Sequence, residues 1–243
     1  MKKSHEWGSD PEFVGPLHHF REGLMMSEIK NNFNGGNILD AGMGGGSLLF
    51  SLAKLGGNCF GIDKSRLFVK YVKEKAKNEG FENIKVTSGE LGKLPYKSGF
   101  FDMIVCGEVV EHINDVPAAK EFARTLKKGG VLVLTTPNGP EQWSVIDDWA
   151  GHKRRYTKES MHELLSKGFK ITKFSYLGFP IIRIYQLLLF RTMVKSKLAS
   201  EKKTKNSLIK TLMSRFLSFV FHFDKLFSWC KLGVGMVVVA KKR

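Results

Sequence analysis

The apolar positions of the first 140 residues form short continuous runs that alternate with longer stretches of helical spacing. The runs predict strands at 37–40, 58–63, 84–87, 101–106 and 131–135. The spaced stretches predict helices at 16–33, 47–55, 65–79 and 116–127. The run at 101–106 is almost wholly apolar, which is typical of a strand buried on both faces of a parallel sheet. This alternation of strand and helix predicts a doubly wound α/β domain.

Beyond residue 140 the pattern adds two strands and an insertion. We expect a helix at 157–166 that is capped by Thr157, a strand at 169–177 and a last strand at 234–240. The sequence therefore predicts a doubly wound, seven-stranded, mostly parallel sheet of the Rossmann-like type. We interpret residues 1–243 as one domain, with a cofactor-binding core at 36–140 and a helical insert at 178–232 before the last strand.

The insert has an amphipathic pattern that allows three interpretations. Its first part, 181–190, is apolar except for Arg183 and Gln186, and it is short for a membrane span. One face of a predicted helix at 208–230 carries Leu208, Leu212, Phe216, Phe219, Phe223, Leu226 and Cys230. Such a stripe usually packs on the protein as a lid, and it also fits an interfacial helix on an anionic membrane. Nucleic acid is the least favoured partner, because the aromatics follow a helical stripe rather than a flat stacking surface.

Composition adds a formal charge of +16 over 243 residues, which suggests an anionic partner. The excess is local, since residues 191–243 hold 13 Lys or Arg against two acids, a balance of +11. Three widely spaced cysteines argue against a disulfide framework or a cysteine zinc site and fit a reducing compartment. No apolar run follows the first lysines, so we expect a cytoplasmic protein, with membrane association left open.

A strand that ends in a glycine-rich turn and opens a helix, at 38–47, is typical of a nucleotide-like ligand site. Asp40 stands directly before the turn, where its carboxylate would repel a pyrophosphate but attract an ammonium or sulfonium group. Ser47 takes the position that a dinucleotide fold fills with its third glycine. Asp63, at the end of the second strand, suits the two hydroxyls of a ribose. Asp40 and Ser47 together favour S-adenosylmethionine over a dinucleotide.

Four ordered segments resemble the class I methyltransferases that use S-adenosylmethionine, in particular their ubiquinone-biosynthesis-like branch. They are ILDAGMGGG (38–46), GIDKS (61–65), SGELGKLPYKSGFFDMIVCGEVVEHI (88–113) and LKKGGVLVLTTPN (126–138). The resemblance implies S-adenosylmethionine as the cofactor, with contacts from Asp40, Gly42, Gly44, Gly46, Asp63, Lys64, Glu90, Leu91 and Cys106. By this resemblance Asp40 and the glycine turn hold the methionine part, Asp63 the ribose, and Glu90 with Leu91 the adenine. Glu90 departs from the aspartate that is frequent at its position.

The segment GEVVEHI places Glu108, Glu111 and His112 at helical spacing i, i+3, i+4, and His152 follows the fifth strand. If the segment is helical, these side chains share one face and suit Mg²⁺, Mn²⁺, Fe²⁺ or Zn²⁺. The quartet resembles the metal site of small-RNA 3′-terminal 2′-O-methyltransferases. Metal-free relatives carry a similar run, however, and without a metal His112 or His152 is the candidate general base.

These observations predict methyl transfer to an oxygen of a small-molecule acceptor, which is hydrophobic or lipid-linked and carries a hydroxyl. Lys153, Arg154 and Arg155 either clamp a phosphate or carboxylate of that acceptor or form a solvated loop. Two alternatives stay open: methylation of an RNA terminus with a divalent metal, and a non-catalytic peripheral membrane module on the same fold.

Overall fold

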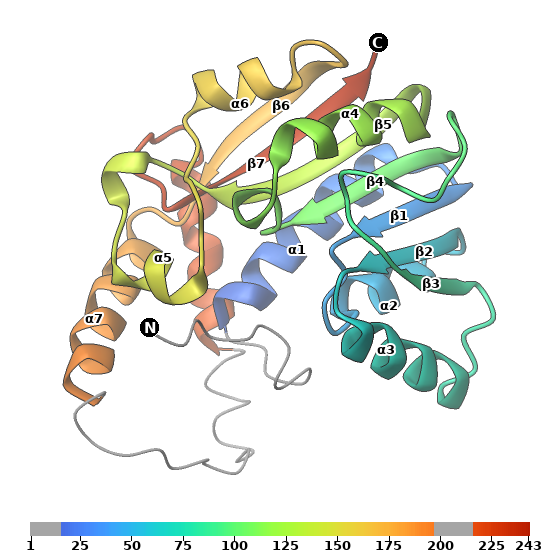
Figure 1. Cartoon of the computed structure of the whole chain (residues 1–243). Coiled ribbons are helices and arrows are strands. Elements are labelled where there is room, and N and C mark those ends of the chain that lie inside the picture. Colours follow the sequence, from blue (N-terminus) through green and yellow to red (C-terminus); the bar gives the residue numbers. More distant parts are fainter. Residues whose placement is uncertain (1–15, 197–215) are drawn as a thin grey trace.

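The computed structural model describes residues 16–196 and 216–243, and the side chains of 189–196 lie outside the description. Seven strands form one sheet in the order β3-β2-β1-β4-β5-β7-β6 (Figure 1). Their bounds are β1 Asn37–Ala41, β2 Asn58–Asp63, β3 Ile84–Ser88, β4 Phe101–Gly107, β5 Leu126–Pro137, β6 Phe169–Leu177 and β7 Gly235–Lys242. Strand β7 runs antiparallel to both of its neighbours, whereas the pairs among β1 to β5 are parallel. The predicted doubly wound, mostly parallel fold is confirmed.

Helices cover both faces of this sheet. Their bounds are α1 Pro16–Asn32, α2 Ser47–Ala53, α3 Arg66–Asn78, α4 Asp115–Thr125, α5 Val145–Ala150, α6 Lys158–Leu165 and α7 Ile181–Ser196. Short 3-10 turns add η1 Val110–His112, η2 Pro140–Gln142 and η3 His222–Phe227. Buried side chains of α1, α2 and α3 pack on one face of the sheet, and those of α4 and α6 pack on the other.

The alternating packing of β4 explains its continuous apolar run. Met103 and Val105 join the cluster under α1 to α3, while Ile104 and Cys106 join the cluster under α4 and α6. Successive side chains of a strand point to opposite faces, so a strand with two covered faces needs apolar residues at every position. The local prediction at Thr157 also holds, because its side chain accepts a hydrogen bond from the Ser160 N–H at 3.2 Å.

The insert departs from the predicted pattern. Leu208 and Leu212 lie outside the described residues, and beyond them helical geometry ends at Phe221, where η3 takes over. The change to 3-10 geometry breaks the predicted stripe, so the helical face expected over 208–230 is wrong for the described part. Phe219 is 65% exposed and Leu226 73%, whereas Phe221 is fully buried.

A third, smaller core cluster attaches the insert to the sheet domain. It joins Phe20 of α1, Ile182 of α7 and Phe221. Asp224 of η3 is buried, and its carboxylate accepts hydrogen bonds at 2.9 Å from the main-chain N–H groups of Ile181 and Ile182. These N–H groups open α7 and have no partner within the helix, so Asp224 caps it. No described helix is both long enough and apolar enough to cross a bilayer.

Candidate active site

The strand order reverses direction at the carboxyl ends of β1 and β4. The chain crosses from β1 outward to β2 and β3 and then returns to β4 on the other side. In open α/β sheets, ligands bind at such a reversal. The loops that follow β1, β2, β4 and β5 all open toward this edge of the sheet (Figure 1), and they carry most of the predicted site residues.

The glycine turn after β1 is held closely against β2. The N–H groups of Gly42 and Met43 donate to the Ile62 carbonyl at 2.8 and 3.2 Å. Gly42, Gly44 and Gly46 have φ values of 86°, 51° and 82°, in the left-handed region that favours glycine. A Cβ at Gly42 would lie 2.5 Å from Val109 Cγ2, whereas one at Gly44 would meet nothing within 4 Å. The turn thus needs Gly42 for packing and leaves open space beside Gly44, as a ligand cradle requires.

Asp40 is a buried acid that forms no ion pair with any described residue. Its side chain is buried, and its Oδ2 has no hydrogen-bond partner among the described residues. Burial, followed by the negative charges of Glu22 and Asp63, raises the pKa of Asp40 to about 8. A carboxylate in such a place is costly unless a positive group arrives. The site therefore fits the ammonium and sulfonium groups of S-adenosylmethionine.

Asp63, at the end of β2, is positioned by the main chain around it. Its Oδ2 accepts from the Gly44 N–H at 3.0 Å and its Oδ1 from the Ser65 N–H at 2.8 Å. Each carboxylate oxygen can accept more than one hydrogen bond, so both can still accept from ribose hydroxyls. Asp63 therefore links the glycine turn to β2.

The remaining predicted cofactor residues lie in different environments. Lys64 and Glu90 are exposed at the surface. Leu91 and Cys106 belong to the core cluster under α4 and α6, and Cys106 is fully buried. Burial first, and then the charge of Glu111, raise the pKa of the Cys106 thiol well above its usual range. The side chain of Cys106 is thus part of the core, as the apolar run at 101–106 indicated.

Glu108 does not join the predicted metal quartet. It adopts a left-handed conformation with φ 56°, and only the three residues Val110–His112 form a 3-10 turn. The helix on which Glu108, Glu111 and His112 would share one face is therefore absent, and that prediction is wrong. Instead, Glu108 Oε2 accepts from Arg21 Nη1 of α1 at 2.7 Å.

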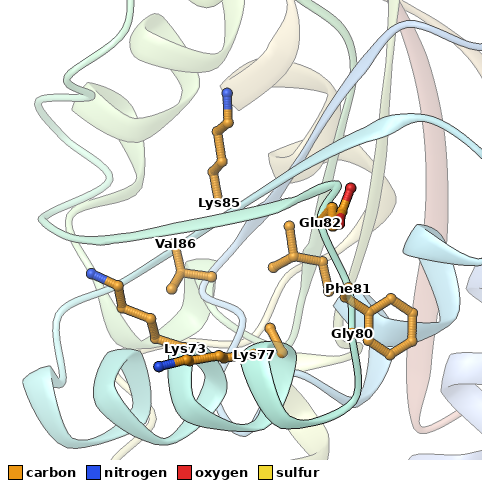
Figure 2. Close-up of a pocket in the computed structure, with 9 residues that line it drawn as sticks. Lys73, Lys77, Gly80, Phe81, Glu82, Lys85 and Val86 are labelled. Carbon is orange, nitrogen blue, oxygen red and sulfur yellow. The ribbon is translucent and has the colours of Figure 1, made fainter.

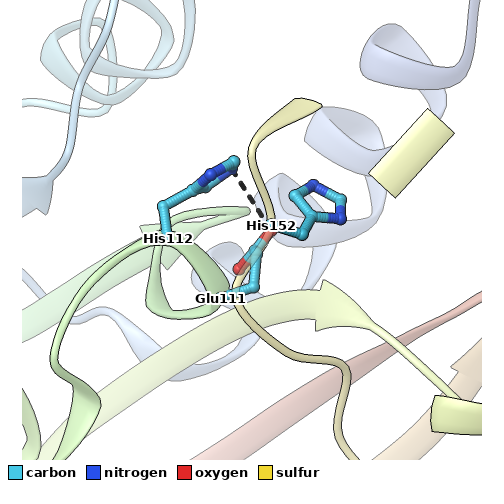
Figure 3. A group of neighbouring side chains, drawn as sticks. All are labelled: Glu111, His112 and His152. Carbon is cyan, nitrogen blue, oxygen red and sulfur yellow. Dashed lines mark ion pairs between the residues drawn. The ribbon is translucent and has the colours of Figure 1, made fainter. Parts of the chain in front are cut away.

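The other three members lie together (Figure 3). Each of Glu111, His112 and His152 offers a ligand atom, and these atoms lie within 4.8 Å of one another. Glu111 is fully buried; its Oε2 accepts from Thr136 Oγ1 at 3.0 Å, and its Oε1 has no hydrogen-bond partner among the described residues. His112 Nε2 lies 4.0 Å from that Oε1, and the two imidazole centroids are 4.8 Å apart.

The electrostatics of this cluster favour neutral side chains. Burial, followed by the charge of Glu108, raises the pKa of Glu111 well above its usual range. Burial, followed by the neighbouring His152, lowers the pKa of His112. A neutral imidazole is the form that binds a metal ion or accepts a proton.

Asp147 is the site residue that sequence reasoning missed. It lies in α5, is fully buried, and its Oδ1 accepts from His152 Nδ1 at 2.8 Å. Burial raises the pKa of Asp147, but hydrogen bonds from His152 and Arg155 outweigh it and hold the pKa well below its usual range. Its spacing from Ser144 predicts a helix cap, which the structure contains. Nothing local indicates its contact with His152.

The partners of the two histidines set their tautomers. A carboxylate or carbonyl oxygen only accepts, so His152 Nδ1 carries a proton toward Asp147, and His112 Nδ1 carries one toward the Gly151 carbonyl at 3.3 Å. In the neutral rings, Nε2 is then the basic nitrogen. A histidine that holds a metal or acts as a base is commonly oriented in this way, by a hydrogen bond from its other ring nitrogen.

The expected basic clamp at 153–155 is already engaged within the protein. Arg154 Nη1 lies 2.6 Å from Asp115 Oδ1, and Arg155 Nε lies 2.7 Å from Asp147 Oδ1. These two guanidinium groups stabilise the loop after α5, which favours the loop over the acceptor clamp for Arg154 and Arg155, whereas Lys153 is exposed and its predicted contact with the acceptor stays a prediction.

A surface groove elsewhere on the molecule contains none of the predicted site residues. It lies between the end of α3 and the edge strand β3 (Figure 2), and Lys73, Lys77 and Lys85 are among its lining residues. The carboxyl ends of β1 and β4 are therefore the only place where the predicted residues of the described chain gather.

The chain is similar to known methyltransferases. A family model described as a methyltransferase domain matches residues 39–134. The ubiquinone biosynthesis O-methyltransferase of Pelagibacter ubique is 32% identical over 152 residues, 56% of this chain and 62% of that protein. The enzyme of the same name from Colwellia psychrerythraea is 38% identical over 114 residues, 46% of each chain. The chain thus matches about half to three fifths of the length of these relatives.

Among solved structures, a putative sarcosine dimethylglycine methyltransferase from Galdieria sulphuraria superposes with a TM-score of 0.68. The superposition covers 92% of this chain and 86% of that one at 16% sequence identity, so it shows the fold alone. Motif order, family match and fold agree: residues 39–134 match a methyltransferase domain, in a chain that has the fold of a solved methyltransferase structure.

Proposed function

We propose that this protein transfers the methyl group of S-adenosylmethionine to a hydroxyl oxygen of a hydrophobic or lipid-linked small molecule. The observation that carries the proposal is Asp40, a buried, unbalanced acid beside a glycine turn with open space at Gly44. In the cluster, Glu111 and His112 follow β4, which pairs with β1, and His152 follows β5, which pairs with β4. A cation-accepting site thus lies next to a proton-accepting one.

In this proposal Asp40 and the main chain of Gly42, Gly44 and Gly46 hold the methionine part of the cofactor. Asp63 accepts hydrogen bonds from the ribose, and Glu90 and Leu91 border the adenine, while Lys64 and Cys106 stay predicted contacts of the cofactor. When bound, the cofactor supplies an electrophilic methyl group on a positively charged sulfur. The protein contributes alignment, because in-line displacement needs the acceptor oxygen held in close and correct orientation.

The histidines supply the second requirement, removal of the hydroxyl proton. His152 is the stronger candidate base, because Asp147 orients its ring and stabilises the imidazolium that forms when Nε2 takes a proton. His112 lies beside it with the same tautomer. Both act here as catalytic residues in the proposal.

The same cluster offers a carboxylate and two imidazoles to a divalent ion such as Mg²⁺, Mn²⁺, Fe²⁺ or Zn²⁺. The fit rests on the unpartnered Oε1 of Glu111 and on the histidines, whose Nδ1 atoms are already engaged. An ion held there would lower the pKa of the acceptor hydroxyl. Metal analysis of the purified protein, repeated on His112→Ala, decides between a metal-assisted reaction and a histidine base that acts without a metal. Full activity of the metal-free enzyme would reject the metal.

The choice of acceptor rests on the relatives, which are named for O-methylation in ubiquinone biosynthesis. An RNA terminus would suit the charge of +16, but no comparison reported above supports it. A non-catalytic membrane module would bind no cofactor, so nothing in that alternative would offset the cost of burying Asp40.

The decisive experiment is calorimetry with S-adenosylhomocysteine, followed by methyl-transfer assays on prenylated phenols, their tail-free analogues and short RNAs. We expect binding that Asp40→Ala abolishes and Glu82→Gln, an exposed acid, leaves intact. Absence of binding to the native protein would favour the non-catalytic module. Transfer to RNA but not to phenols would replace the proposed acceptor.

A further inference from the structure

The insert exposes a large group of apolar side chains, which we call the aromatic patch. Its members lie on α7 and in the segment 216–232, and they include Leu187 58%, Phe219 65%, Phe223 55%, Leu226 73%, Trp229 75% and Leu232 50% exposed. The two segments are neighbours, since the rings of Tyr185 and Phe221 pack at 5.2 Å and Arg183 Nη1 donates to the Leu232 carbonyl at 2.7 Å. Contiguous exposed apolar surface of this kind marks an interaction site.

The patch is not needed to hold the insert in place. The inner side of the same segment does that, through fully buried Phe221 and the capping carboxylate of Asp224. The outer aromatic residues therefore contribute little to the core. A lid stripe packed on the sheet would bury Phe219 and Leu226, so the exposure of these residues argues against the lid.

Charge identifies the partner. In the described residues 178–188 and 216–232, Asp224 is the only acid, and it is buried and engaged with α7. The cations of the same stretch are Arg183, Lys225 and Lys231, and both lysines are exposed. A surface with exposed apolar and cationic groups but no exposed carboxylate complements an anionic lipid bilayer. A second copy of the chain is a poor match, because each copy carries +16.

The patch lies at the same end of the sheet as the site. Leu177 and Pro137 both pair with Gly235, so the insert emerges where β5 ends. Asn138, just after β5, donates to the carbonyls of Lys231 and Gly233 at 3.0 and 2.8 Å. Figure 1 shows α7, α5 and α1 gathered at this end.

We propose that the aromatic patch docks on an anionic membrane surface and turns the open end of the active site toward the bilayer. Trp229, Leu226 and Phe219 enter the interface, while Lys225 and Lys231 contact lipid phosphates. A lipid-linked acceptor then reaches the site without leaving the membrane. The docking stands on the patch alone, whereas the benefit to the acceptor rests on the proposed function.

The test is flotation of the full chain with vesicles of phosphatidylcholine alone or with about a third phosphatidylglycerol. We expect binding to the anionic vesicles, weakened by salt. The double variant Leu226→Ser, Trp229→Ser should lose more than about tenfold in vesicle affinity, because two large side chains no longer leave water. Lys225→Glu with Lys231→Glu should lose a similar factor.

Matched controls use exposed residues far from the patch. Leu67→Ser with Val116→Ser removes side chains that are 59% and 50% exposed on α3 and α4, and Lys128→Glu changes an exposed charge at the start of β5. Failure of the native chain to float, or equal losses in patch and control variants, overturns the proposal. A dimer in sedimentation that the patch variant dissociates assigns the patch to a second copy instead.

Binding of S-adenosylhomocysteine separates the test of membrane docking from the test of the proposed methyltransferase function. The patch variant should bind S-adenosylhomocysteine like the native protein, and Asp40→Asn should float like it. Flotation without cofactor binding would leave membrane docking intact while rejecting the proposed function.

Discussion

The candidate active site has two halves that differ in their chemistry. The main-chain half consists of Asp40 and the glycine turn, and the imidazole half consists of Glu111, His112 and His152. Each contains a buried carboxyl group with one oxygen that has no hydrogen-bond partner in the described chain, Asp40 near the end of β1 and Glu111 after β4. Burial raises the pKa of both. Asp40 stands directly before the glycine turn. Glu111 lies beside two imidazoles, and the Nδ1 atom of each imidazole is hydrogen-bonded to Asp147 or to the Gly151 carbonyl. The first arrangement suits a cation carried by a ligand, and the second suits a proton or a metal ion.

The largest effect should come from the imidazole half. His152→Gln removes the proposed base and should lower kcat by about 10²- to 10⁴-fold. S-adenosylhomocysteine affinity should stay unchanged, because His152 lies in the other half. Rapid-quench methyl transfer and calorimetry measure the two quantities. A variant with native kcat would show that His152 takes no part in the chemistry.

The next effect should come from the main-chain half. Asp40→Asn should weaken S-adenosylhomocysteine binding by about 30-fold or more, since a buried charge partner of the ammonium group is lost. The apo protein should at the same time melt at a higher temperature above neutral pH, because an unbalanced buried charge is removed. Calorimetry and thermal unfolding test both statements. Weaker binding together with lower stability would instead indicate a structural role for Asp40.

A smaller effect should follow at Asp147. Asp147→Asn should lower kcat by about 10- to 100-fold without changing cofactor affinity, because the ring of His152 loses its orienting carboxylate. Asp148→Asn is the matched control, since Asp148 is the exposed neighbour in the same helix. Asp147→Glu, which keeps the carboxylate, should recover part of the loss. Equal losses of folded protein for all three variants would reduce Asp147 to a structural role.

The smallest effect is a pH dependence that belongs to Asp40. With a folded pKa of about 8 against an ordinary 3.8, its protonated form stabilises the apo protein fully below pH 4. That contribution is lost as the pH rises through 8. Cofactor binding needs the carboxylate, so affinity should rise by at most about tenfold per pH unit up to 8 and then level off. Calorimetry between pH 6 and about 8.5 measures this slope, and a native-like slope in Asp40→Asn would contradict the assignment.

The two halves also differ in how far the sequence predicted them. In the main-chain half, Asp40 and the glycine turn are contiguous and Asp63 ends the next strand, so each could be identified from a short motif. In the imidazole half, Glu111 and His112 were identified, but Glu108 was misplaced. Helical spacing assumes helical backbone, and the left-handed Glu108 removes that condition.

The sequence by itself determined the alternation of strands and helices, the cofactor class and the glycine turn, because these depend on local backbone preference and on side chains close together in the chain. Only the tertiary structure decided which carboxylates lack a partner among the described residues, that Asp147 contacts His152, and that the aromatic patch of the insert is exposed. Burial and long-range hydrogen bonds depend on segments far apart in sequence, so no local pattern encodes them.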